Sequence, residues 1–227
     1  MDGIILSNEV IHSLKILKNP GMILKLDLSN AFDKLSWTYI NQILLAFGFS
    51  ATWTQWIMNL ISSPCFSIML NGSPSAPFRP SHGIRQGDPL SPFLFVLMAE
   101  GLSGLLHSAI SSHTLKGISL HGLPPISHQQ FVDDNMLFGH PSAQEASAFK
   151  SLLNLFSEAS GTTINASKSQ LFFFHTPTLT QRNVARILGF LIAVLPSKYL
   201  GAPPLESVIK HASWRSLLDH LETRLSS

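Results

Sequence analysis

The sequence predicts an α+β fold, in which helices and strands are mixed without the strict alternation of a doubly wound parallel sheet. Two observations support this prediction. Apolar residues recur with helical spacing in several segments, and short apolar runs bounded by Gly, Pro or Asn have the composition of strands. The chain has 227 residues, of which 45% are hydrophobic, so it is long enough to bury a sizeable core.

The first half of the chain is predicted to contain helices, one long strand and a β-hairpin. In chain order they are a helix over residues 4–18, a strand over 22–28, helices over 36–48 and 51–62, and a hairpin over about 65–80. Ser36 is a residue type that caps helix N-termini, and Gly48 is one that ends helices. Asn71-Gly72 supplies the positive φ angles that a type I′ hairpin turn requires.

The second half is predicted to mix the same two kinds of element. In chain order they are a helix over about 92–110, strands within 118–138, a helix from Ser142 to near Gly161, a strand over about 169–174, a short helix from Thr180 and a final helix from about 207. Ser91 and Pro92 suit the N-cap and first position of a helix. Ser142 and Glu145 have the spacing of a capping box.

Charged residues make up only 12% of the chain, against a usual value of about 25%. A composition this apolar argues against disorder. It also suggests that part of the apolar surface is covered by sequence not included here. The net charge is +2 at pH 7, with a pI near 8.8, which is compatible with a nucleic-acid partner but does not by itself indicate one.

The single Cys65 excludes an internal disulfide framework and a cysteine-based zinc site. The histidines follow no metal-ligand spacing; among them are His107, His113, His121 and His128. The start of the chain lacks the basic region of a signal peptide, and the longest apolar run, 93–99, is far shorter than a membrane span. We therefore expect an intracellular protein, in the nucleus or cytoplasm, with no membrane partner.

Asp133 and Asp134 lie side by side between two apolar runs. Two anions about 4 Å apart repel by roughly 4 kcal/mol at an effective dielectric constant near 20, so water, a cation or a metal must offset the repulsion. Adjacent residues of a straight strand point to opposite faces, whereas a tight turn lets both carboxylates point the same way. An ordinary polar turn is the alternative interpretation.

Asp27 interrupts an apolar strand, where a carboxylate is costly unless it is paired or bound to a metal. Asp33 follows the strand and is interpreted as a solvated or capping residue. A strand carboxylate together with a hairpin carboxylate pair is an arrangement that two-metal phosphoryl-transfer enzymes use. Sequence spacing alone does not show that Asp27 and Asp133 meet.

The segment GIRQGDPLSP combines Gly83 and Gly87, which let the backbone approach a ligand closely, with the planar cation of Arg85. The alternative is a loop leading into a helix, in which Gly and Pro serve turn geometry alone.

The segments KLDLSNAFDKLSW, NGSPSAPFRPSHGIRQGDPLSPFLFVLMAEGLS, ISHQQFVDD, SGTTINASKSQ and LPSKYLGAPPL follow one another along the chain. In this order they resemble the motif blocks of the reverse transcriptase domain of non-LTR (LINE-type) retrotransposons, particularly the plant kind. The first block is usually written K-x-D-x-x-K-A-F-D, and the third is usually Phe-Ala-Asp-Asp. Group II intron-type reverse transcriptases are a more distant alternative, because the forms RQGDPLSP and KYLG fit LINE elements better.

This resemblance implies the palm of a right-handed polymerase, which is an antiparallel sheet backed by helices, with RNA-directed DNA polymerase activity. It also implies that Asp27, Asp133 and Asp134 are catalytic residues that hold two Mg²⁺ ions, for which Mn²⁺ could substitute. The bound metal would then offset the repulsion between the two adjacent carboxylates.

Further roles follow by position from the same resemblance. Phe32 resembles the residue beneath the incoming sugar that excludes a 2′-OH. Arg85, Gln86 and Gly87 resemble nucleotide-binding and template-facing residues. Lys168 resembles a proton donor to pyrophosphate, the alternative being a solvated loop lysine.

The resemblance implies an RNA template, a DNA primer and dNTPs as partners. It also implies a division of the chain into a fingers remnant (1–20), a palm (21–195) with a fingers-type insertion (about 36–90), and a thumb-proximal segment (196–227). Most of the fingers, the thumb and the endonuclease region are not included and have no identified replacement. We therefore expect weak, salt-sensitive template binding and little processive extension.

The chain departs from the family pattern at a few positions. Asn30 replaces a lysine, Gln129 a leucine and Val132 a small alanine, and His82 stands where an arginine is common. None of these changes removes a metal ligand, but together they resemble drift in an element under weak constraint. The alternative function is therefore an inactive, truncated retroelement remnant that is non-enzymatic or binds nucleic acid weakly.

Overall fold

The structure is a computed structural model that describes residues 2–120, 123–131 and 134–195. The chain divides into two compact units, which we describe separately. Unit 1 contains residues 1–27 and 106–150 and the chain from residue 165 onward, whereas unit 2 contains residues 28–105 and 151–164. Two long helices, α5 (Ser91–Ser111) and α6 (Ala143–Ser160), contribute residues to both units.

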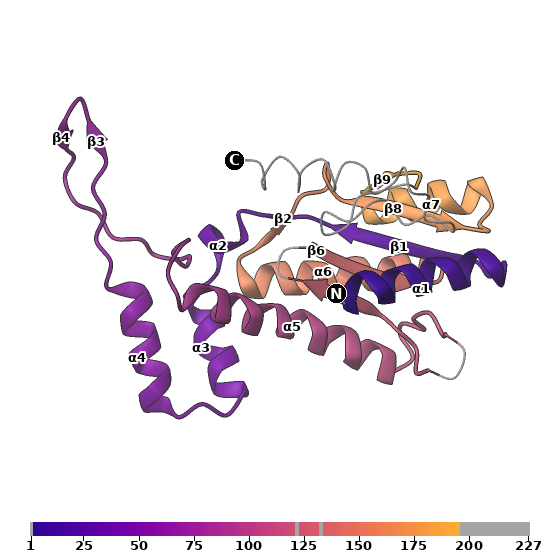
Figure 1. Ribbon diagram of the computed structural model, residues 1–227, viewed down its shortest axis with the longest axis horizontal. Coiled ribbons are helices and arrows are strands. Elements are labelled where there is room, and N and C mark those ends of the chain that lie inside the picture. Colours follow the sequence, from indigo (N-terminus) through magenta and orange to yellow (C-terminus); the bar gives the residue numbers. More distant parts are fainter. Residues whose placement is uncertain (1, 121–122, 132–133, 196–227) are drawn as a thin grey trace, which may run out of the picture. The chain divides into compact units, whose positions relative to one another are not determined.

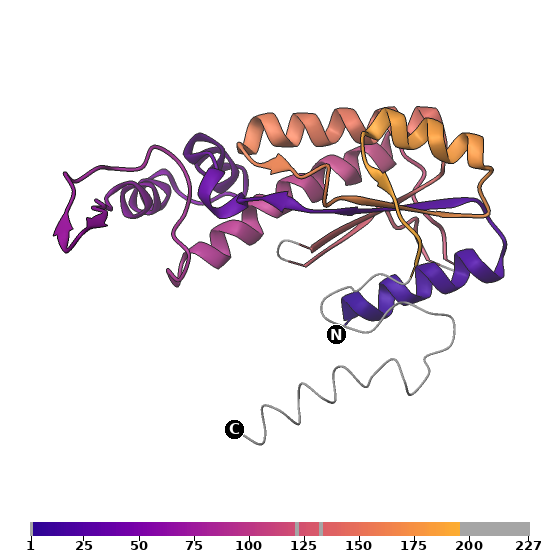
Figure 2. The same cartoon turned by 90° about the horizontal axis from the view of Figure 1, so that it is seen from above.

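Unit 1 is a five-stranded sheet with helices on both faces (Figures 1 and 2). Its other elements are α1 (Asp2–Ile16), β1 (Gly21–Leu26), β5 (His128–Phe131), β6 (Asp134–Gly139), β8 (Gln170–Phe174), α7 (Thr178–Leu188) and β9 (Leu191–Ile192). The strand order is β5-β6-β1-β8-β9, and every neighbouring pair is antiparallel except β8 and β9. α1 covers one face of the sheet, and α7 and the start of α6 cover the other.

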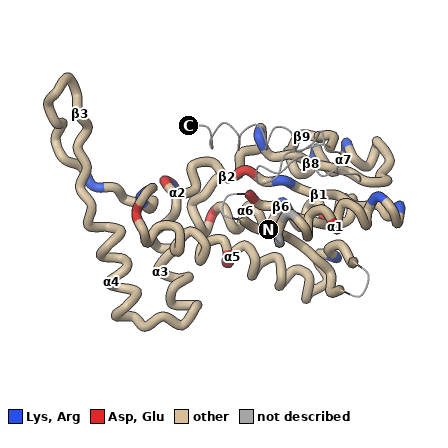
Figure 3. Tube along the Cα trace, in the orientation of Figure 1, with Lys and Arg blue, Asp and Glu red and all other residues tan. Residues whose placement is uncertain are grey.

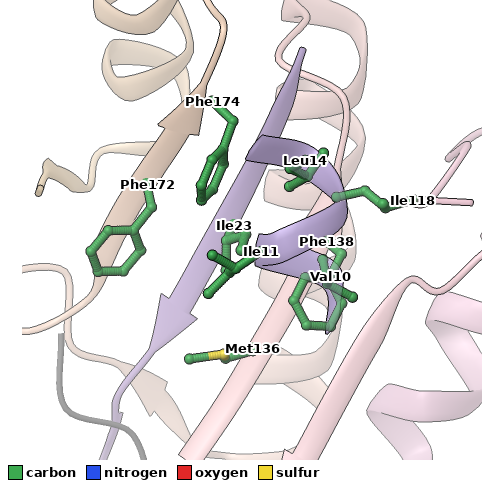
Figure 4. Close-up of a cluster of buried hydrophobic side chains, with 9 residues drawn as sticks. All are labelled: Val10, Ile11, Leu14, Ile23, Ile118, Met136, Phe138, Phe172 and Phe174. Carbon is green, nitrogen blue, oxygen red and sulfur yellow. The ribbon is translucent and has the colours of Figure 1, made fainter. Parts of the chain in front are cut away.

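The core of unit 1 follows from the alternation of side chains along the central strand. In β1, Ile23 lies opposite Phe138 of β6 and Phe172 of β8. These residues belong to a cluster beneath α1 that is shown in Figure 4 and contains Val10, Ile11, Leu14, Ile23, Ile118, Met136, Phe138, Phe172 and Phe174. The next residue, Leu24, is also fully buried, so β1 is apolar because both faces of the sheet are covered.

Unit 2 is mainly helical. Its elements are β2 (Leu28–Ser29), α2 (Ala31–Lys34), α3 (Trp37–Ala46), α4 (Ala51–Ser62), β3 (Met69–Leu70), β4 (Ser73–Pro74) and β7 (Thr163–Ile164). β2 pairs with β7, and β3 pairs with β4. No Asp, Glu, Lys or Arg occurs from residue 35 to residue 78, so α3, α4 and β3 appear without charged positions in Figure 3.

The helices of unit 2 begin where local chemistry predicts. The hydroxyl oxygen of Ser36 accepts a hydrogen bond from the Tyr39 N–H (3.3 Å), which confirms the predicted N-cap of α3. Ser50 caps α4 in the same way through the Trp53 N–H (3.2 Å). Burial raises the pKa of Tyr39 to about 12, and its hydroxyl donates to the carbonyl oxygen of Met98 at 3.1 Å.

Several predicted elements differ from the structure. α7 begins at Thr178 rather than Thr180, and β1 ends at Leu26 rather than continuing to residue 28. The hairpin around Asn71-Gly72 has the expected positive φ angles of 49° and 82°, but its strands have only two residues each. α2, β7 and β9 were not predicted. The expected helix from about 207 lies outside the described residues.

The predicted capping box is present only in part. The Ser142 hydroxyl accepts a hydrogen bond from the Glu145 N–H at 3.1 Å, as expected. The Glu145 carboxylate, however, accepts from the His140 N–H at 2.8 Å rather than returning to Ser142. Glu145 is 3% exposed, so this bond gives one oxygen of a buried carboxyl group a backbone partner.

Among the described helices, α5 alone is long and apolar enough to cross a membrane by length and composition. Its buried residues lie along one side of the helix and are Leu94, Phe95, Met98, Leu102, Leu106 and Ala109. This spacing is typical of a helix that packs one face against the rest of a protein.

Candidate functional site

Asp27 and Asp134 lie at matching ends of two neighbouring antiparallel strands. The β1–β6 register pairs Leu26 with Asn135. The next pair in the same register is Asp27 and Asp134. Residues that lie opposite each other in an antiparallel pair have Cα atoms roughly 4.5–5.5 Å apart. The register, continued by one residue beyond the pairs that form, therefore predicts that two carboxylates far apart in sequence lie close together.

The alternation of side chains assigns both carboxylates to one face of the sheet. Asp27 follows Ile23 by four residues, and Asp134 precedes Phe138 by four residues. Ile23 and Phe138 both belong to the cluster beneath α1. The pattern therefore places Asp27 and Asp134 on the α1 side of the sheet, at the end where β1 stops.

The backbone of Asp27 is held by the turn that precedes β8. The Asp27 N–H donates to the Ser169 hydroxyl at 3.1 Å, and its carbonyl oxygen accepts from the Asn165 N–H at 2.8 Å. The residue is half-buried, and its carboxylate has no hydrogen bond or ion pair with any residue that the structure describes. A half-buried carboxylate that has no cationic partner among the described residues is suited to binding a metal.

Lys168 is exposed and lies in the same turn. Its N–H donates to the carbonyl oxygen of Asn165 at 3.2 Å, and its neighbour Ser169 contacts Asp27. The turn therefore brings the Lys168 backbone near the end of β1. Its role as a proton donor stays a prediction.

Asp133 and Val132 lie outside the described residues. Phe131 and Asp134 are paired, so these two residues form the whole connection between β5 and β6. Within the described ranges, no group of three or more His, Cys, Asp or Glu side chains could hold a metal ion. Because Asp133 lies outside these ranges, the three-aspartate metal site stays a prediction.

Phe32 lies in unit 2, where its ring stacks on Phe95 at a centroid distance of 4.6 Å and an interplanar angle of 5°. Its carbonyl oxygen accepts the Ile84 N–H at 2.7 Å. Phe32 is half-buried, whereas Phe95 is 1% exposed and supports the ring from within the unit. The role of Phe32 in sugar selection stays a prediction, because Asp27 belongs to the other unit.

The loop that contains Arg85, Gln86 and Gly87 leads into α5. All three residues are exposed. Arg85 forms an ion pair with Asp88 at 2.6 Å, and the other oxygen of that carboxylate accepts the Leu90 N–H at 2.9 Å. An exposed pair of this kind contributes only about 0–1 kcal/mol, so Arg85 could exchange Asp88 for a ligand phosphate at little cost.

A hollow of about 660 Å³ opens beside this loop within unit 2. The side chains of Arg79, His82 and Arg85 supply cationic or polar groups, and Phe66 and Phe78 supply aromatic faces. Cations bind phosphate oxygens and aromatic faces stack on bases, so this lining suits nucleic acid or a nucleotide.

The structure accommodates two of the departures from the family pattern. Asn30 has φ 48° and ψ 41°, a left-handed conformation that Asn tolerates better than most residues. Gln129 is 8% exposed, and its side-chain oxygen accepts a hydrogen bond from the Ser7 hydroxyl at 2.9 Å. At a third such position, His82 is exposed, and its ring Nδ1 lies 3.1 Å from the Ser81 hydroxyl oxygen.

Sequence reasoning missed the residues that hold the candidate site in place. Asn165 and Ser169 fix the Asp27 backbone, and Phe95 supports Phe32. The segment NASKS was available as a signal for the first pair, because Asn and Ser favour turns that bond to neighbouring backbone. Nothing in the sequence distinguished Phe95 from the other apolar residues of α5.

Two curated relatives show where the similarity lies. An uncharacterized mitochondrial protein of Arabidopsis thaliana is 48% identical over 67 residues, which are 29% of this chain and 55% of that protein. The retrovirus-related Pol polyprotein of a type-2 retrotransposable element of Drosophila melanogaster is 34% identical over 116 residues, which are 51% of this chain and 10% of the polyprotein. The matched regions thus span only 55% and 10% of these two relatives.

Solved telomerase structures share the fold. The Candida albicans enzyme, in complex with a TWJ fragment of telomeric RNA, has a TM-score of 0.60 at 12% identity, with coverage of 89% of this chain and 32% of that chain. The corresponding Candida tropicalis complex has a TM-score of 0.58 at 11% identity, with coverage of 75% and 29%. These similarities, together with the mainly antiparallel sheet, confirm the predicted palm-like α+β fold.

The family model described as reverse transcriptase (RNA-dependent DNA polymerase) matches residues 2–203. This match covers most of the chain; it includes the first four segments that carried the predicted resemblance and the fifth as far as Pro203. The Drosophila relative is a retrotransposon Pol polyprotein, and a transposon TX1 protein of Xenopus laevis is 26% identical over 168 residues, 74% of this chain and 12% of that protein, which together confirm the non-LTR type. The chain belongs to the reverse transcriptase (RNA-dependent DNA polymerase) family, as a domain of the non-LTR retrotransposon type.

Proposed function

We propose that this chain is the catalytic core of an RNA-directed DNA polymerase of a LINE-type retroelement. Its reaction would transfer a nucleotide from a dNTP to a primer 3′-OH, with RNA as template. The observation that carries the proposal is the β1–β6 register, whose last pair is Leu26 and Asn135. One further step in this register would place Asp27 opposite Asp134. This arrangement would provide two carboxylates at the same end of neighbouring strands, as two-metal phosphoryl transfer requires.

The donor set fits divalent metal ions. Asp27 and Asp134 offer carboxylate oxygens, the ligands that Mg²⁺ prefers, and the Asp27 carboxylate lacks a cation partner among the described residues. With Asp133 they would hold two Mg²⁺ ions, and Mn²⁺ could substitute. Bound there, such ions would activate the attacking 3′-OH and stabilise charge on the triphosphate.

The remaining residues would bind and orient the substrates. Phe32, fixed by its stack on Phe95, would exclude a ribose 2′-OH by contact. The Arg85 side chain would bind phosphate, while Gln86 and Gly87 would face the nucleotide and template. Lys168 would donate a proton to the pyrophosphate leaving group.

Primer extension on an RNA template tests this proposal. Asp27→Asn keeps the shape of the side chain but removes its charge, so we expect at least a ~100-fold loss of Mg²⁺-dependent extension, in line with the loss of electrostatic transition-state stabilisation. Glu158→Gln makes the same chemical change at an exposed position of α6 and should leave activity unchanged. Mn²⁺ binding, followed by electron paramagnetic resonance, should weaken only in Asp27→Asn.

Two results would contradict the proposal. Equal extension by Asp27→Asn and wild type would exclude a catalytic role for Asp27. Absence of both extension and Mn²⁺ binding in the wild-type chain would instead support the inactive remnant.

A further inference from the structure

The outward side of α1 carries an apolar groove within unit 1. Ile5 and Ile16 are 55% and 61% exposed on this side. Together with Leu17 they line a hollow of about 560 Å³, and Leu120 and Leu123 line it from the opposite side. Exposed apolar side chains this close together favour a partner that removes them from water. We call this hollow the α1 groove.

The described chain ends on the same side of the sheet. Ala193 and Leu195 pack against the buried cluster that includes Val10, Ile11 and Leu14 of α1. Residues 196–227 follow directly. The chain beyond residue 195 is therefore attached next to α1, and its effective concentration at the α1 groove is high.

The sequence of this following segment has the apolar spacing of an amphipathic helix. Trp214, Leu217, Leu218, Leu221 and Leu225 recur at intervals of i, i+3, i+4, i+7 and i+11. With helical spacing, Ser216 and Thr223 would fall on the opposite side. A single helix with one apolar stripe needs a surface to cover that stripe, because isolated helices of this length are marginal in water.

We infer that the segment 207–225 docks as a helix into the α1 groove, which makes the groove an internal interface of this chain. The lengths agree: residues 214–225 form roughly 16 Å of helix, and the 15 residues of α1 form roughly 22 Å. The connecting residues 196–206 can span up to about 35 Å. Among the described lining residues the carboxylate comes from Glu9. In the docked helix Arg224 would flank one side of the apolar stripe with opposite charge, and Arg215 and Glu222 would flank the other.

Thiol labelling of the full-length chain tests this inference. Cys65 is exposed and is first replaced by Ser, and Ile16→Cys then places a single thiol in the α1 groove. We compare the maleimide reaction rate in this protein with the rate after Leu218→Asp/Leu225→Asp, on the apolar side. The matched control is Ser216→Asp/Thr223→Asp, which adds the same charge at the same separation on the polar side.

We expect the apolar-side pair to accelerate labelling of the Ile16→Cys thiol about ten-fold, which corresponds to about 1.4 kcal/mol of docking free energy. The polar-side pair should not change the rate. A reference thiol from Leu179→Cys, at a position 82% exposed on α7, should react at the same rate in all three proteins. A synthetic peptide of residues 207–225, added to the apolar-side variant, should restore slow labelling.

Equal labelling rates in all three proteins, without protection by the peptide, would overturn the inference. So would protection that grows with protein concentration, because that result would identify a second copy of the chain as the occupant. If the apolar-side pair also accelerated the Leu179→Cys reference and the peptide gave no rescue, a general loss of structure would replace docking as the explanation.

Discussion

Gly83 and Gly87 offer a matched test of how the loop before α5 is held. Both glycines have nearly the same left-handed backbone, with φ angles of 85° and 84°. A Cβ atom on Gly83 would lie 2.5 Å from the Asp33 carbonyl oxygen, whereas a Cβ on Gly87 would meet nothing within 4 Å. Gly83→Ala therefore adds a clash with backbone to the strain that both substitutions share.

The expected magnitudes follow from these two terms. The left-handed conformation costs a non-glycine residue roughly 1–2 kcal/mol, so Gly87→Ala should lower the free energy of unfolding by about that amount. Forcing an extra carbon into packed structure costs a further ~1–3 kcal/mol. The two costs together should lower the free energy of unfolding of Gly83→Ala by about 2–5 kcal/mol. The Gly83 N–H donates to the Leu35 carbonyl oxygen at 2.8 Å, and the Gly83 carbonyl oxygen accepts the Trp37 indole N–H at 2.7 Å. The clash would strain both bonds.

Urea unfolding followed by tryptophan fluorescence measures both variants. The indole of Trp37 reports directly on the Gly83 bond, so the Gly83→Ala spectrum should also shift before unfolding. If Gly83→Ala and Gly87→Ala lowered the free energy of unfolding equally, the clash would be refuted, because residues 32–35 would then move enough to accommodate the added Cβ atom.

Three further outcomes follow from the structure. The Thr54 hydroxyl is buried without a hydrogen-bond partner in the described structure, so Thr54→Val should raise the free energy of unfolding by about 1 kcal/mol, while Thr52→Val on the exposed side should change it by less than about 0.5 kcal/mol. Burial and the neighbouring His107 lower the pKa of His128 from 6.5 to about 4. As the pH falls, His128 is therefore protonated in the unfolded chain before it is protonated in the folded chain, which favours unfolding. Stability measured by denaturant titration should fall by about 2 kcal/mol from pH 8 to pH 5, and His128→Gln should reduce that fall. If the chain extends primers, Phe32→Ala should incorporate ribonucleotides more readily than wild type; unchanged discrimination would remove Phe32 from sugar selection.

Elements with strong local signals could be predicted from the sequence. Ser36 and Asn71-Gly72 impose backbone geometry on their immediate neighbours, and both were identified correctly. β2, β7 and β9 each have two residues, which are too few to show any periodicity. Such strands form because tertiary structure brings their backbones together. Pairing of this kind cannot be read from local composition.

For the candidate site, too, the individual residues could be predicted from local sequence, but their proximity could not. Asp27 stood out because a carboxylate interrupts an apolar strand, and Asp134 because it adjoins another carboxylate. Their proximity depends on the register of β1 against β6, which is fixed by the packing of residues such as Ile23 opposite Phe138. Sequence spacing contains no information on that register, so in the sequence only the family resemblance predicted that these residues lie together.

The structure shows that two departures from the family pattern, Gln129 and Asn30, fit their surroundings. A residue that drifts into a buried position usually leaves a polar group without a partner, which costs about 1–3 kcal/mol. Gln129 instead receives a hydrogen bond from Ser7, a residue of α1 that is itself fully buried. Asn30 occupies a left-handed conformation in which a lysine would be more strained. These two substitutions are matched to their surroundings, so they do not by themselves support a decayed protein. The choice between polymerase and remnant therefore depends on whether the wild-type chain extends primers and binds Mn²⁺, and Asp27→Asn then tests whether that activity depends on the aspartates.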